Sequence, residues 1–525
     1  MISRSRVFIP AAGLGSRIDG GGSLLPKPLR SIGSKPLLTR VMDLYPNGTS
    51  FVIGLGFKAS WVKQVAMITA KANNQEVDFF ETDSWEVPGK GLTDTVLGAQ
   101  HFLQERFIFH AVDTLVSPKT LASLFLSEQD TIVVGQPTTN GSYRALSNGQ
   151  WKKVSFEPSS RQLAYTGVAL IQDYETFWKK LSERKRLEEN EGEVLGIDPE
   201  TCLSFEIQGG EWVDCGNLAG LAAAQANNVR EDIVLERNNE AIWHIGSEMI
   251  KFHVDEIFIR NRALRATQLR PFVPEIHVRG PNTYSYPREN GITLSAGEIG
   301  AFHQFLKFLE DFWDLTPSLT KANSVVNVDS RYLDFYQKKT YVRVKEFLEK
   351  YPAYDVTSIN DRTTSRILEL LKTVNWDHLA RVKLTRAHGD LHPDNILIVN
   401  SSLGFTLLDW RQDIAGSSGK EGDIYYDLAK IKHGLIVDHG LVAKGKFTVA
   451  IESKKAKYEM QQTSKKKQWQ SELEDFISRS ELDSQKVDLI TSLIFLNIAC
   501  LHHSPYDEFL FVLGHDLLQK SLKNL

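Results

Sequence analysis

The first part of the chain alternates short β-rich runs with longer amphipathic segments. Strands are expected over VFIPAA (7–12), SFVIGLGF (50–57), VDFFET (77–82), RFIFHAVD (106–113), DTIVVGQP (130–137) and TGVALI (166–171). Helices are expected at 36–45, 60–72, 92–104 and 118–128, with a helix of small residues at 218–228. Strands that alternate with helices favour a mostly parallel sheet with both faces covered.

The pattern changes from about residue 232. The segment 232–254 has strand-like runs broken by turn signals, whereas 296–315 has apolar residues at helical spacing. The strands ILIV (396–399) and FTLLDW (405–410) precede a mostly helical tail, in which 453–476 is expected as one charged helix. Its lysines suit a docking patch or, more simply, a solvated face. No internal repeat or long linker occurs, so two units are expected to abut near 225–235.

Composition excludes some classes of function. The 525 residues are 42% apolar and 24% charged, as in ordinary globular proteins, and a net charge of −4 gives no global attraction for nucleic acid or anionic lipid. Three widely spaced cysteines suit reduced thiols. The N-terminus does not have the pattern of a signal peptide, and no apolar run of about 18 residues occurs. We expect a cytoplasmic protein without a membrane or nucleic-acid partner. The oligomeric state is not indicated.

A glycine-rich turn, AAGLGSR (11–17), follows the first expected strand. Gly13 and Gly15 allow a tight turn whose N–H groups can face an anion at a helix start. Arg17 adds a planar charged fork suited to phosphate oxygens. A plain strand-to-helix turn is the alternative, because the third glycine of a dinucleotide fingerprint and the Gly-Lys-Ser/Thr end of a P-loop are missing. Lys27 follows between two prolines, so it loses less entropy when it is ordered.

AAGLGSR together with PKPL (26–29) and GSKPLL (33–38) resembles the sugar-phosphate nucleotidyltransferase family, which includes bacterial cytidylyltransferases for phosphocholine. The resemblance implies a doubly wound, Rossmann-like α/β domain over 1–228, with CTP favoured among nucleoside triphosphates. It implies nucleotide contacts at Ala12, Gly13, Gly15, Arg17 and Lys27, of which Arg17 and Lys27 are also catalytic. The loop GKGLTDTVLGA (89–99) is similar to the base-reading segment of the family, which implies a further contact at Gly91.

Two aspartates match the magnesium ligands of this family. Asp113 ends a strand in IFHAVDTLVSP, and Asp214 lies before a Gly-Asn turn in EWVDCGN. Two carboxylates around a triphosphate suit Mg²⁺, which neutralises charge while a phosphate oxygen of the second substrate displaces pyrophosphate. A strand-end capping role is the alternative for Asp113.

The stretch HGDLHPDNIL (388–397) places Asn395 five residues after Asp390. Protein kinases use this spacing in their catalytic loop, where the aspartate accepts the proton of the substrate hydroxyl and the asparagine binds Mg²⁺. Asp409 follows in FTLLDWRQD, at the tip of an apolar strand. A carboxylate is costly there unless it is paired or bound to a metal.

HGDLHPDNIL, LLDW and GDIYYDLAK together resemble the aminoglycoside phosphotransferase and choline kinase family. The resemblance implies a two-lobed, protein-kinase-like (α+β) domain over 229–525. In it, Asp390 is catalytic, Asn395 and Asp409 bind Mg²⁺, and Lys251 in GSEMIKF contacts the ATP phosphates. A strand lysine that faces solvent is the alternative for Lys251, and Glu256 is a weak candidate for its partner.

Other polar residues of these motifs are expected to have structural roles. His388 and His392 could ligate a metal by residue type, but the resemblance implies that both are structural. Asp423 and Asp427 in GDIYYDLAK are expected to pin the loop through hydrogen bonds.

The two resemblances imply a bifunctional enzyme. ATP would phosphorylate a small alcohol, amino alcohol or sugar, and CTP or another NTP would then convert the product into an NDP-activated precursor for capsule, lipopolysaccharide or another surface polysaccharide. Three alternatives stay open: an NDP-sugar pyrophosphorylase with an anomeric sugar kinase, a kinase for an amino acid or amide, and one active domain with a ligand-sensing module. A choline site should show an aromatic box with acids, and the scattered aromatic residues do not decide this.

Overall fold

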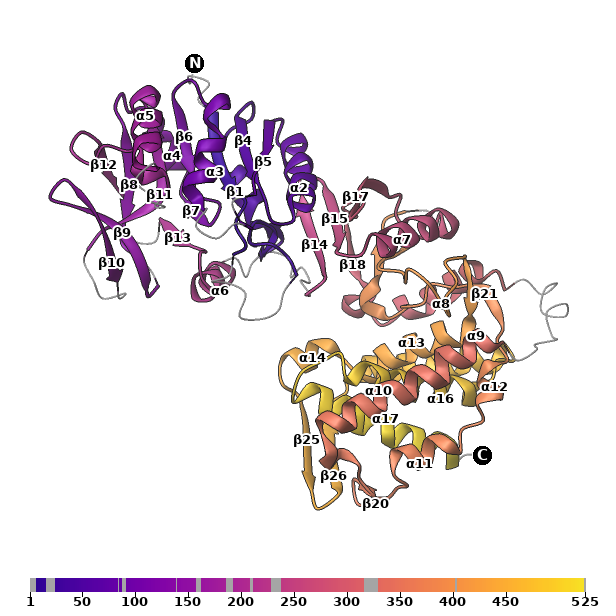
Figure 1. Ribbon diagram of the computed structural model, residues 1–525. Coiled ribbons are helices and arrows are strands. Elements are labelled where there is room, and N and C mark those ends of the chain that lie inside the picture. Colours follow the sequence, from indigo (N-terminus) through magenta and orange to yellow (C-terminus); the bar gives the residue numbers. More distant parts are fainter. Residues whose placement is uncertain are drawn as a thin grey trace. The chain divides into compact units, whose positions relative to one another are not determined.

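The computed structural model describes residues 6–15, 24–83, 85–86, 91–137, 139–156, 162–185, 192–207, 211–227, 238–315, 329–401 and 404–523. The chain forms two compact units, residues 1–259 with 277–288 and residues 260–276 with 289–525 (Figure 1). The boundary expected from the sequence, at residue 228, lies at the start of a segment outside the described residues. Among the described helices, none combines the length and the apolar character needed to cross a membrane.

The main sheet of the first unit has the strand order β12-β8-β11-β6-β1-β4-β5. Its strands are β1 (Arg6–Ala11), β4 (Ser50–Leu55), β5 (Glu76–Glu81), β6 (Phe107–His110), β8 (Thr131–Gly135), β11 (Ala164–Ile171) and β12 (Leu203–Glu206). Strand β11 is antiparallel to both of its neighbours, and the other pairs are parallel. The predicted mostly parallel, Rossmann-like α/β arrangement is confirmed for this unit.

The helices of this unit are α1 (Leu37–Met42), α2 (Ala59–Ala72), α3 (Leu92–Gly98), α4 (Pro118–Phe125), α5 (Tyr174–Lys185) and α6 (Leu218–Asn227). Small strands add β2 (Ser31–Ile32), β3 (Lys35–Pro36), β7 (Thr114–Val116), β9 (Gly141–Ser147), β10 (Gln150–Phe156) and β13 (Trp212–Asp214). Strands β9 and β10 pair as an antiparallel hairpin that the sequence analysis did not predict. Its turn residues, Asn148 and Gly149, have φ values of 52° and 67°. Asn-Gly at such a turn is a strong hairpin signal that the sequence analysis missed.

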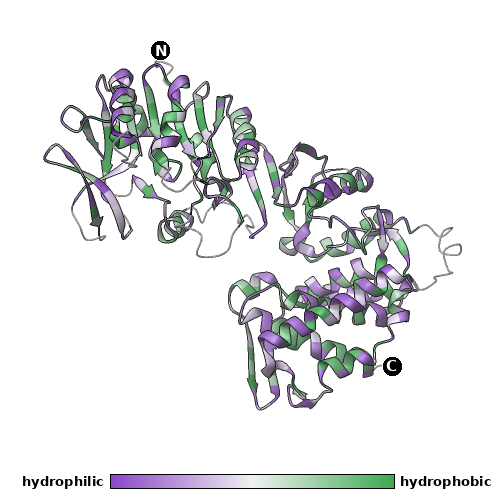
Figure 2. Cartoon of the chain, viewed as in Figure 1, coloured by the Kyte–Doolittle hydropathy of each residue, from purple (hydrophilic) through white to green (hydrophobic). Residues whose placement is uncertain are grey.

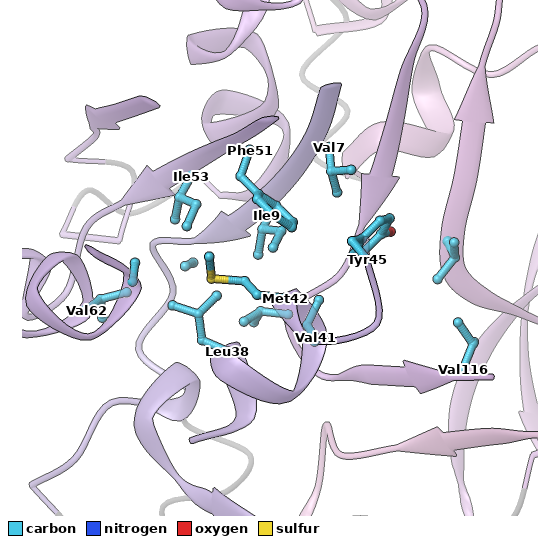
Figure 3. Close-up of a cluster of buried hydrophobic side chains, with 14 of the residues drawn as sticks. Val7, Ile9, Leu38, Val41, Met42, Tyr45, Phe51, Ile53, Val62 and Val116 are labelled. Carbon is cyan, nitrogen blue, oxygen red and sulfur yellow. The ribbon is translucent and has the colours of Figure 1, made fainter. Parts of the chain in front are cut away.

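Both faces of the main sheet are buried. Alternate side chains of β1 point to opposite faces, so that Val7 and Ile9 belong to one apolar cluster and Phe8 to another. Figure 3 shows Val7 and Ile9 with residues of β4 and helices α1 and α2. Phe8 shares its cluster with residues of α3 and α5. The apolar colouring of these strands (Figure 2) is typical of a sheet covered on both faces. The loop after β1 therefore begins from a rigid strand.

A second, antiparallel sheet, β14-β15-β17-β16, also belongs to the first unit. It consists of β14 (Glu240–Ile245), β15 (Glu248–His253), β16 (His277–Gly280) and β17 (Thr283–Pro287). Trp243 and Phe252 join the apolar cluster that contains Val7, and Phe252 lies 5.3 Å from Trp61 of α2 between ring centroids. The sequence division at residue 228 assigned this sheet to the C-terminal domain. In the structure, the sheet belongs to the first compact unit, because its apolar face is buried there.

Helices dominate the second unit. They are α8 (Ala301–Trp313), α9 (Ser330–Leu333), α10 (Lys339–Lys350), α11 (Ile367–Lys372), α12 (Trp376–Ala380), α13 (Ile424–Ile436), α14 (His439–Ala443), α15 (Ser464–Arg479), α16 (Ser484–Ala499) and α17 (Tyr506–Lys523), and α7 (Glu256–Leu269) begins in the first unit. A π-helical turn, Asp334–Lys338, joins α9 to α10. Short strands are β18 (Gly291–Thr293), β19 (Ser358–Ile359), β20 (Arg362–Thr363), β21 (Leu384–Arg386), β22 (Ile396–Val399), β23 (Phe405–Leu407), β24 (Glu421–Asp423), β25 (Phe447–Glu452) and β26 (Lys455–Met460).

The expected single helix over 453–476 is wrong. Residues 455–460 form β26, which pairs with β25, because Ala456, Tyr458 and Met460 alternate with exposed residues at a period of two. Helix α15 begins only after Thr463, whose side chain accepts a hydrogen bond from the backbone N–H of Lys466. The lysine-rich composition concealed this change of period.

Candidate functional site

The sheet of the first unit has a topological switch point at β1. The chain proceeds from β1 to β4 and β5 on one side, and then returns to place β6 on the other side of β1. In open α/β sheets, ligands bind outside the carboxyl ends of the strands at such a point. The loop from Ala12 to Gly15 follows β1, and Asp113 follows β6. The fold therefore brings two of the predicted motifs to one edge of the sheet.

The loop after β1 is shaped by Gly15. Its φ of +71° lies in the left-handed region, and a Cβ built on it would lie 2.8 Å from the Cβ of Lys27. Gly13 is exposed, and a Cβ built on it would have no other atom within 4 Å. The preceding carbonyl, of Ala12, is already occupied, because it accepts a hydrogen bond from the N–H of Phe57 at 3.0 Å. An anion can thus approach the backbone at Gly13. Arg17 lies outside the described residues.

Three of the predicted groups converge beside this loop. The ammonium of Lys27 forms an ion pair with the carboxylate of Asp113. A Cβ built on Gly216 would lie 2.8 Å from Oδ1 of Asp214 and 2.9 Å from Oδ2 of Asp113. The N–H of Cys215 donates to the carbonyl of Asp113 at 2.7 Å, which fixes the two acidic segments against each other. Only glycine fits at 216 without moving these carboxylates.

The electrostatics of this acidic pair suit a cation. Burial is the largest cause that raises the pKa of Asp214, and the charge of the neighbouring Asp113 raises it further. Hydrogen bonds from the Gly216 N–H and from Tyr143 act to lower this pKa. The hydroxyl of Tyr143 donates to Oδ2 of Asp214 at 2.8 Å. Carboxylate oxygens are the ligands that Mg²⁺ prefers, so Asp113 and Asp214 fit the ion that the sequence resemblance implies. Tyr143 comes from the β9–β10 hairpin, and no local motif marked it.

Gly91 occupies the N-cap of α3. Its N–H donates to Oδ2 of Asp94 at 3.1 Å, and its carbonyl accepts from the N–H of Thr95 at 3.2 Å. Both backbone groups are thus used in the first turn of the helix. The base contact predicted for Gly91 remains a prediction.

Replacing Gly15 with alanine tests the shape of the loop. We expect Gly15→Ala to destabilise the first unit by about 1–2 kcal/mol, because a left-handed backbone crowds a Cβ, and to weaken nucleotide binding through the displaced Lys27. Thermal unfolding and nucleotide titration measure both effects. Gly300→Ala is the control, since Gly300 has a φ of −74° and open space around a built Cβ. Equal effects of the two substitutions would contradict the account.

In the second unit, the carboxylate of Asp390 lies in the loop between β21 and β22. The side-chain amide of Asn395 donates to the carbonyl of Asp390 at 2.9 Å and to its Oδ2 at 3.3 Å. Lys430 of α13 approaches Oδ1 of Asp390 to 2.7 Å. Burial acts to raise the pKa of Asp390, but Lys430 and His392 outweigh it and hold this pKa well below its usual range. The carboxylate is thus charged over the whole physiological range of pH.

Asp427 fixes the backbone of this loop. Its carboxylate accepts from the N–H groups of His388 and Gly389 at 2.8 and 2.7 Å, and from the indole N–H of Trp313 at 3.3 Å. Burial raises the pKa of Asp427 to about 6, against these hydrogen bonds. Asp423 likewise accepts from the hydroxyl of Tyr336 at 2.9 Å. The contacts of Asp427 are the loop-pinning contacts that the sequence predicts, whereas the hydrogen bonds of Asp423 reach Tyr336 and the backbone of Lys383, outside the 388–397 loop.

Asp409 follows β23 with a φ of +57°. Its carboxylate forms an ion pair with Arg262 of α7, whose carbonyl accepts a hydrogen bond from the indole N–H of Trp410 at 3.0 Å. Arg262 is 6% exposed, whereas Asp409 is 34% exposed, so the aspartate is the accessible member of the pair. The Asp409 carboxylate, which the sequence suggested must be paired or bound to a metal, is partly exposed and has a protein partner, Arg262, which the sequence analysis did not identify.

Lys251 of β15 belongs to the first unit, and its side chain is 2% exposed. It forms an ion pair with Glu240, on the neighbouring strand β14. The solvent-facing alternative is therefore wrong. Glu256 is exposed, and the partner is Glu240 instead. The role of Lys251 toward ATP stays a prediction.

The two histidines of the motif differ in their surroundings. His388 is fully buried, and its Nδ1 accepts from the N–H of Asp390 at 3.2 Å, which is a structural role. His392, Asp394 and His439 present ligand atoms that all lie within 4.8 Å of one another. His439 and Asp394 are already paired at 2.8 Å.

The partner of Asp390 gives a pH prediction. Lys430→Met removes the strongest cationic influence on Asp390, so the pKa of this carboxyl rises. The acidic limb of the ATP-dependent phosphorylation that the sequence predicts should move up by about one pH unit or more, since a nearby opposite charge lowers a carboxyl pKa by 1–3 units. The pH profile of kcat/KM measures this. Lys432→Met is the control, because Lys432 lies on the same helix and pairs with Asp488. An unmoved limb would contradict the electrostatic role.

No protein-family model and no curated protein matches the chain. Several solved structures are similar to its N-terminal part. A putative glucose-1-phosphate thymidylyltransferase from Bacillus anthracis has 16% identity and a TM-score of 0.32, over 45% of this chain and 98% of its own. The inositol-1-phosphate CTP transferase of T. maritima has 14% identity and a TM-score of 0.35, over 44% and 99%. The CTP:phosphocholine cytidylyltransferase of Streptococcus pneumoniae has 14% identity and a TM-score of 0.32, over 43% and 99%.

Proposed function

We propose that the chain is a bifunctional transferase, in which the second unit phosphorylates a small hydroxyl compound with ATP and the first unit couples the product to a nucleoside monophosphate from CTP or another NTP. The product is an NDP-activated building block for a surface polysaccharide. The observation that supports this best is that each unit has its own set of carboxylates with a lysine partner. Asp113 and Asp214 lie with Lys27 in the first unit, and Asp390 lies with Lys430 in the second.

In the first unit, the exposed backbone at Gly13 and the ammonium of Lys27 are suited to hold the phosphates of an NTP. Lys27 exchanges its contact with Asp113 for phosphate oxygens when the nucleotide binds. A phosphate oxygen of the second substrate attacks the α-phosphorus in line, and pyrophosphate leaves. The chain supplies position and charge, and no protein nucleophile is needed.

In the second unit, Asp390 orients the acceptor hydroxyl and receives its proton as the γ-phosphoryl group is transferred. Asn395 and Lys430 hold the carboxylate in place. Its low pKa makes it a weak base, so its main effect is to orient the hydroxyl, as expected for a loose phosphoryl-transfer transition state.

Asp113 with Asp214, and Asn395 with Asp409, are the oxygen donors that would hold Mg²⁺ in the two units. When bound there, it supplies neutralisation of phosphate charge. In the second unit, Arg262 is the cation that Asp409 must exchange for the ion. The accessible position of Asp409 within that pair makes the exchange possible.

A steady-state assay tests the proposal. The purified full chain is given Mg-ATP and Mg-CTP with a panel of polyols, amino alcohols, hydroxy acids and sugars, and ADP and pyrophosphate are measured over time. We expect pyrophosphate to appear only with an acceptor that has first consumed ATP. Pyrophosphate release that never depends on ATP, with no ADP formed from any acceptor, would contradict consecutive steps.

A further inference from the structure

Cationic and aromatic side chains gather around Tyr426 of α13, which lies near Asp390. The ring of Phe335, in the π-helical turn, lies 5.0 Å from the ring of Tyr426. The ammonium of Lys339 lies 5.0 Å from the Phe335 ring centroid, and the guanidinium carbon of Arg411 lies 5.6 Å from it. Nη1 of Arg411 reaches the Tyr426 hydroxyl at 3.4 Å. With Lys430, three cations thus gather around Tyr426, which also lies near Asp390. A π-helical turn, as in Asp334–Lys338, is frequent at functional sites.

The acids near this group do not balance it. Asp390 is paired with Lys430. Asp413 is near Arg411, whose Nε donates to the Asp413 carbonyl at 3.2 Å and whose pKa that carboxylate helps to raise. Among the described residues, no carboxylate forms an ion pair with Lys339, whose ammonium lies over the Phe335 ring and near Arg411, Lys430 and Tyr426. Within the part of the chain that the structure describes, the charge of Lys339 therefore has no acidic partner, and it lies on the same aromatic pair, Phe335 and Tyr426, as Arg411.

The directions of two pKa shifts agree with this excess of positive charge. Burial acts to raise the pKa of the Tyr426 hydroxyl, yet Arg411, Lys430 and Lys339 together lower it below its usual value. Burial lowers the pKa of Lys339, and Arg411 and Lys430 also lower it, against the opposite influence of Tyr426. Both pKa shifts indicate a site that stabilises negative charge and destabilises positive charge.

We infer that the acceptor phosphorylated beside Asp390 carries an anionic group, a carboxylate or a phosphate, which Lys339 and Arg411 bind while Asp390 orients its hydroxyl. This rests on the proposed kinase function of the second unit. Arg411 presents a planar fork suited to a carboxylate or phosphate, and Lys339 adds a point charge. The aromatic rings of Phe335 and Tyr426 form the walls.

The same arrangement argues against a quaternary or primary ammonium substrate. Recognition of such cations uses aromatic faces together with acids. Here the faces of Phe335 are already approached by Lys339 and Arg411, which would repel a second cation. Choline and ethanolamine, which stood among the candidates suggested by the sequence, are therefore disfavoured.

Small acceptors that differ in charge test the inference, and three of them share the three-carbon skeleton of glycerol. Glycerol, glycerate and glycerol phosphate are compared with choline and ethanolamine, by ADP formation with Mg-ATP and by thermal shift in the presence of Mg-ADP. We expect at least one anionic compound to exceed glycerol about tenfold or more in kcat/KM, as one charge-assisted contact provides. The carboxylate and phosphate members distinguish the two kinds of anion.

Lys339→Met should raise the KM for that anionic acceptor about tenfold with little change in kcat, since it removes a binding contact only. Lys338→Met is the matched control, because Lys338 is 73% exposed and faces Asp334. The inference is overturned if neutral or cationic acceptors have a kcat/KM equal to that of the anionic acceptors, or if Lys339→Met leaves the KM for the anionic acceptor unchanged. It is also overturned if no anionic compound stabilises the protein while Mg-ADP still does. Failure of Mg-ADP itself to stabilise the protein would instead overturn the kinase function on which the inference rests.

Discussion

Asp390→Asn is expected to abolish ATP-dependent phosphorylation while the protein stays folded. The substitution keeps the size of the side chain but removes the charge that pairs with Lys430 and accepts the hydroxyl proton. Loss of a positioned acid–base group lowers kcat by about 10²–10⁴-fold. ADP formation with the best acceptor of the panel measures the effect, and pyrophosphate release from a pre-phosphorylated acceptor should be unchanged.

Asp394→Asn is the matched control, four residues along the same loop, where the carboxylate pairs with His439. We expect it to retain most kinase activity. If Asp390→Asn and Asp394→Asn lose activity equally, the loop matters only for folding, and the role assigned to Asp390 is wrong.

Asp113→Asn should have a comparable effect on nucleotidyl transfer. It removes one of the two carboxylates that converge at Gly216 and also the ion-pair partner of Lys27. Loss of several kcal/mol of charge stabilisation corresponds to a decrease of about 10²-fold or more in rate. Pyrophosphate release from CTP and a phosphorylated acceptor measures it, while ADP formation should persist.

Asp43→Asn provides a control with the same chemistry, because Asp43 also pairs with a lysine, Lys35, in the first unit. Its effect on pyrophosphate release should be within about twofold, as for an ordinary surface ion pair. Full nucleotidyl transfer by Asp113→Asn would remove this residue from the site.

The main sheet could be predicted from the sequence because its signals are local. Six of its seven strands were expected as short apolar runs bounded by turn residues, and Asp113 ends one of these runs, whereas β12 was not expected. Strand order then places the loop after β1 and Asp113 at one edge. The sequence could not show which distant residue forms a hydrogen bond or ion pair with each of these polar side chains. Tyr143 reaches Asp214 across 71 positions.

The second unit shows the same limit. The Asp390–Asn395 spacing was readable because both residues lie in one loop. Lys430 and Arg262 were not identified, since each lies on a helix distant in sequence from the carboxylate it meets. The cations around Phe335 were likewise invisible, because they come from separate segments of the chain. Tertiary packing, and no local pattern, creates these charge pairs.

The central claim is that one chain holds two separate Mg-nucleotide sites. Equilibrium titration with non-hydrolysable ATP and CTP analogues, with and without Mg²⁺, tests it without knowledge of the acceptor. The account predicts two sites per chain, of which Asp113→Asn weakens only the CTP site and Asp409→Asn only the ATP site. A single site per chain, or the loss of both sites in either variant, would contradict it.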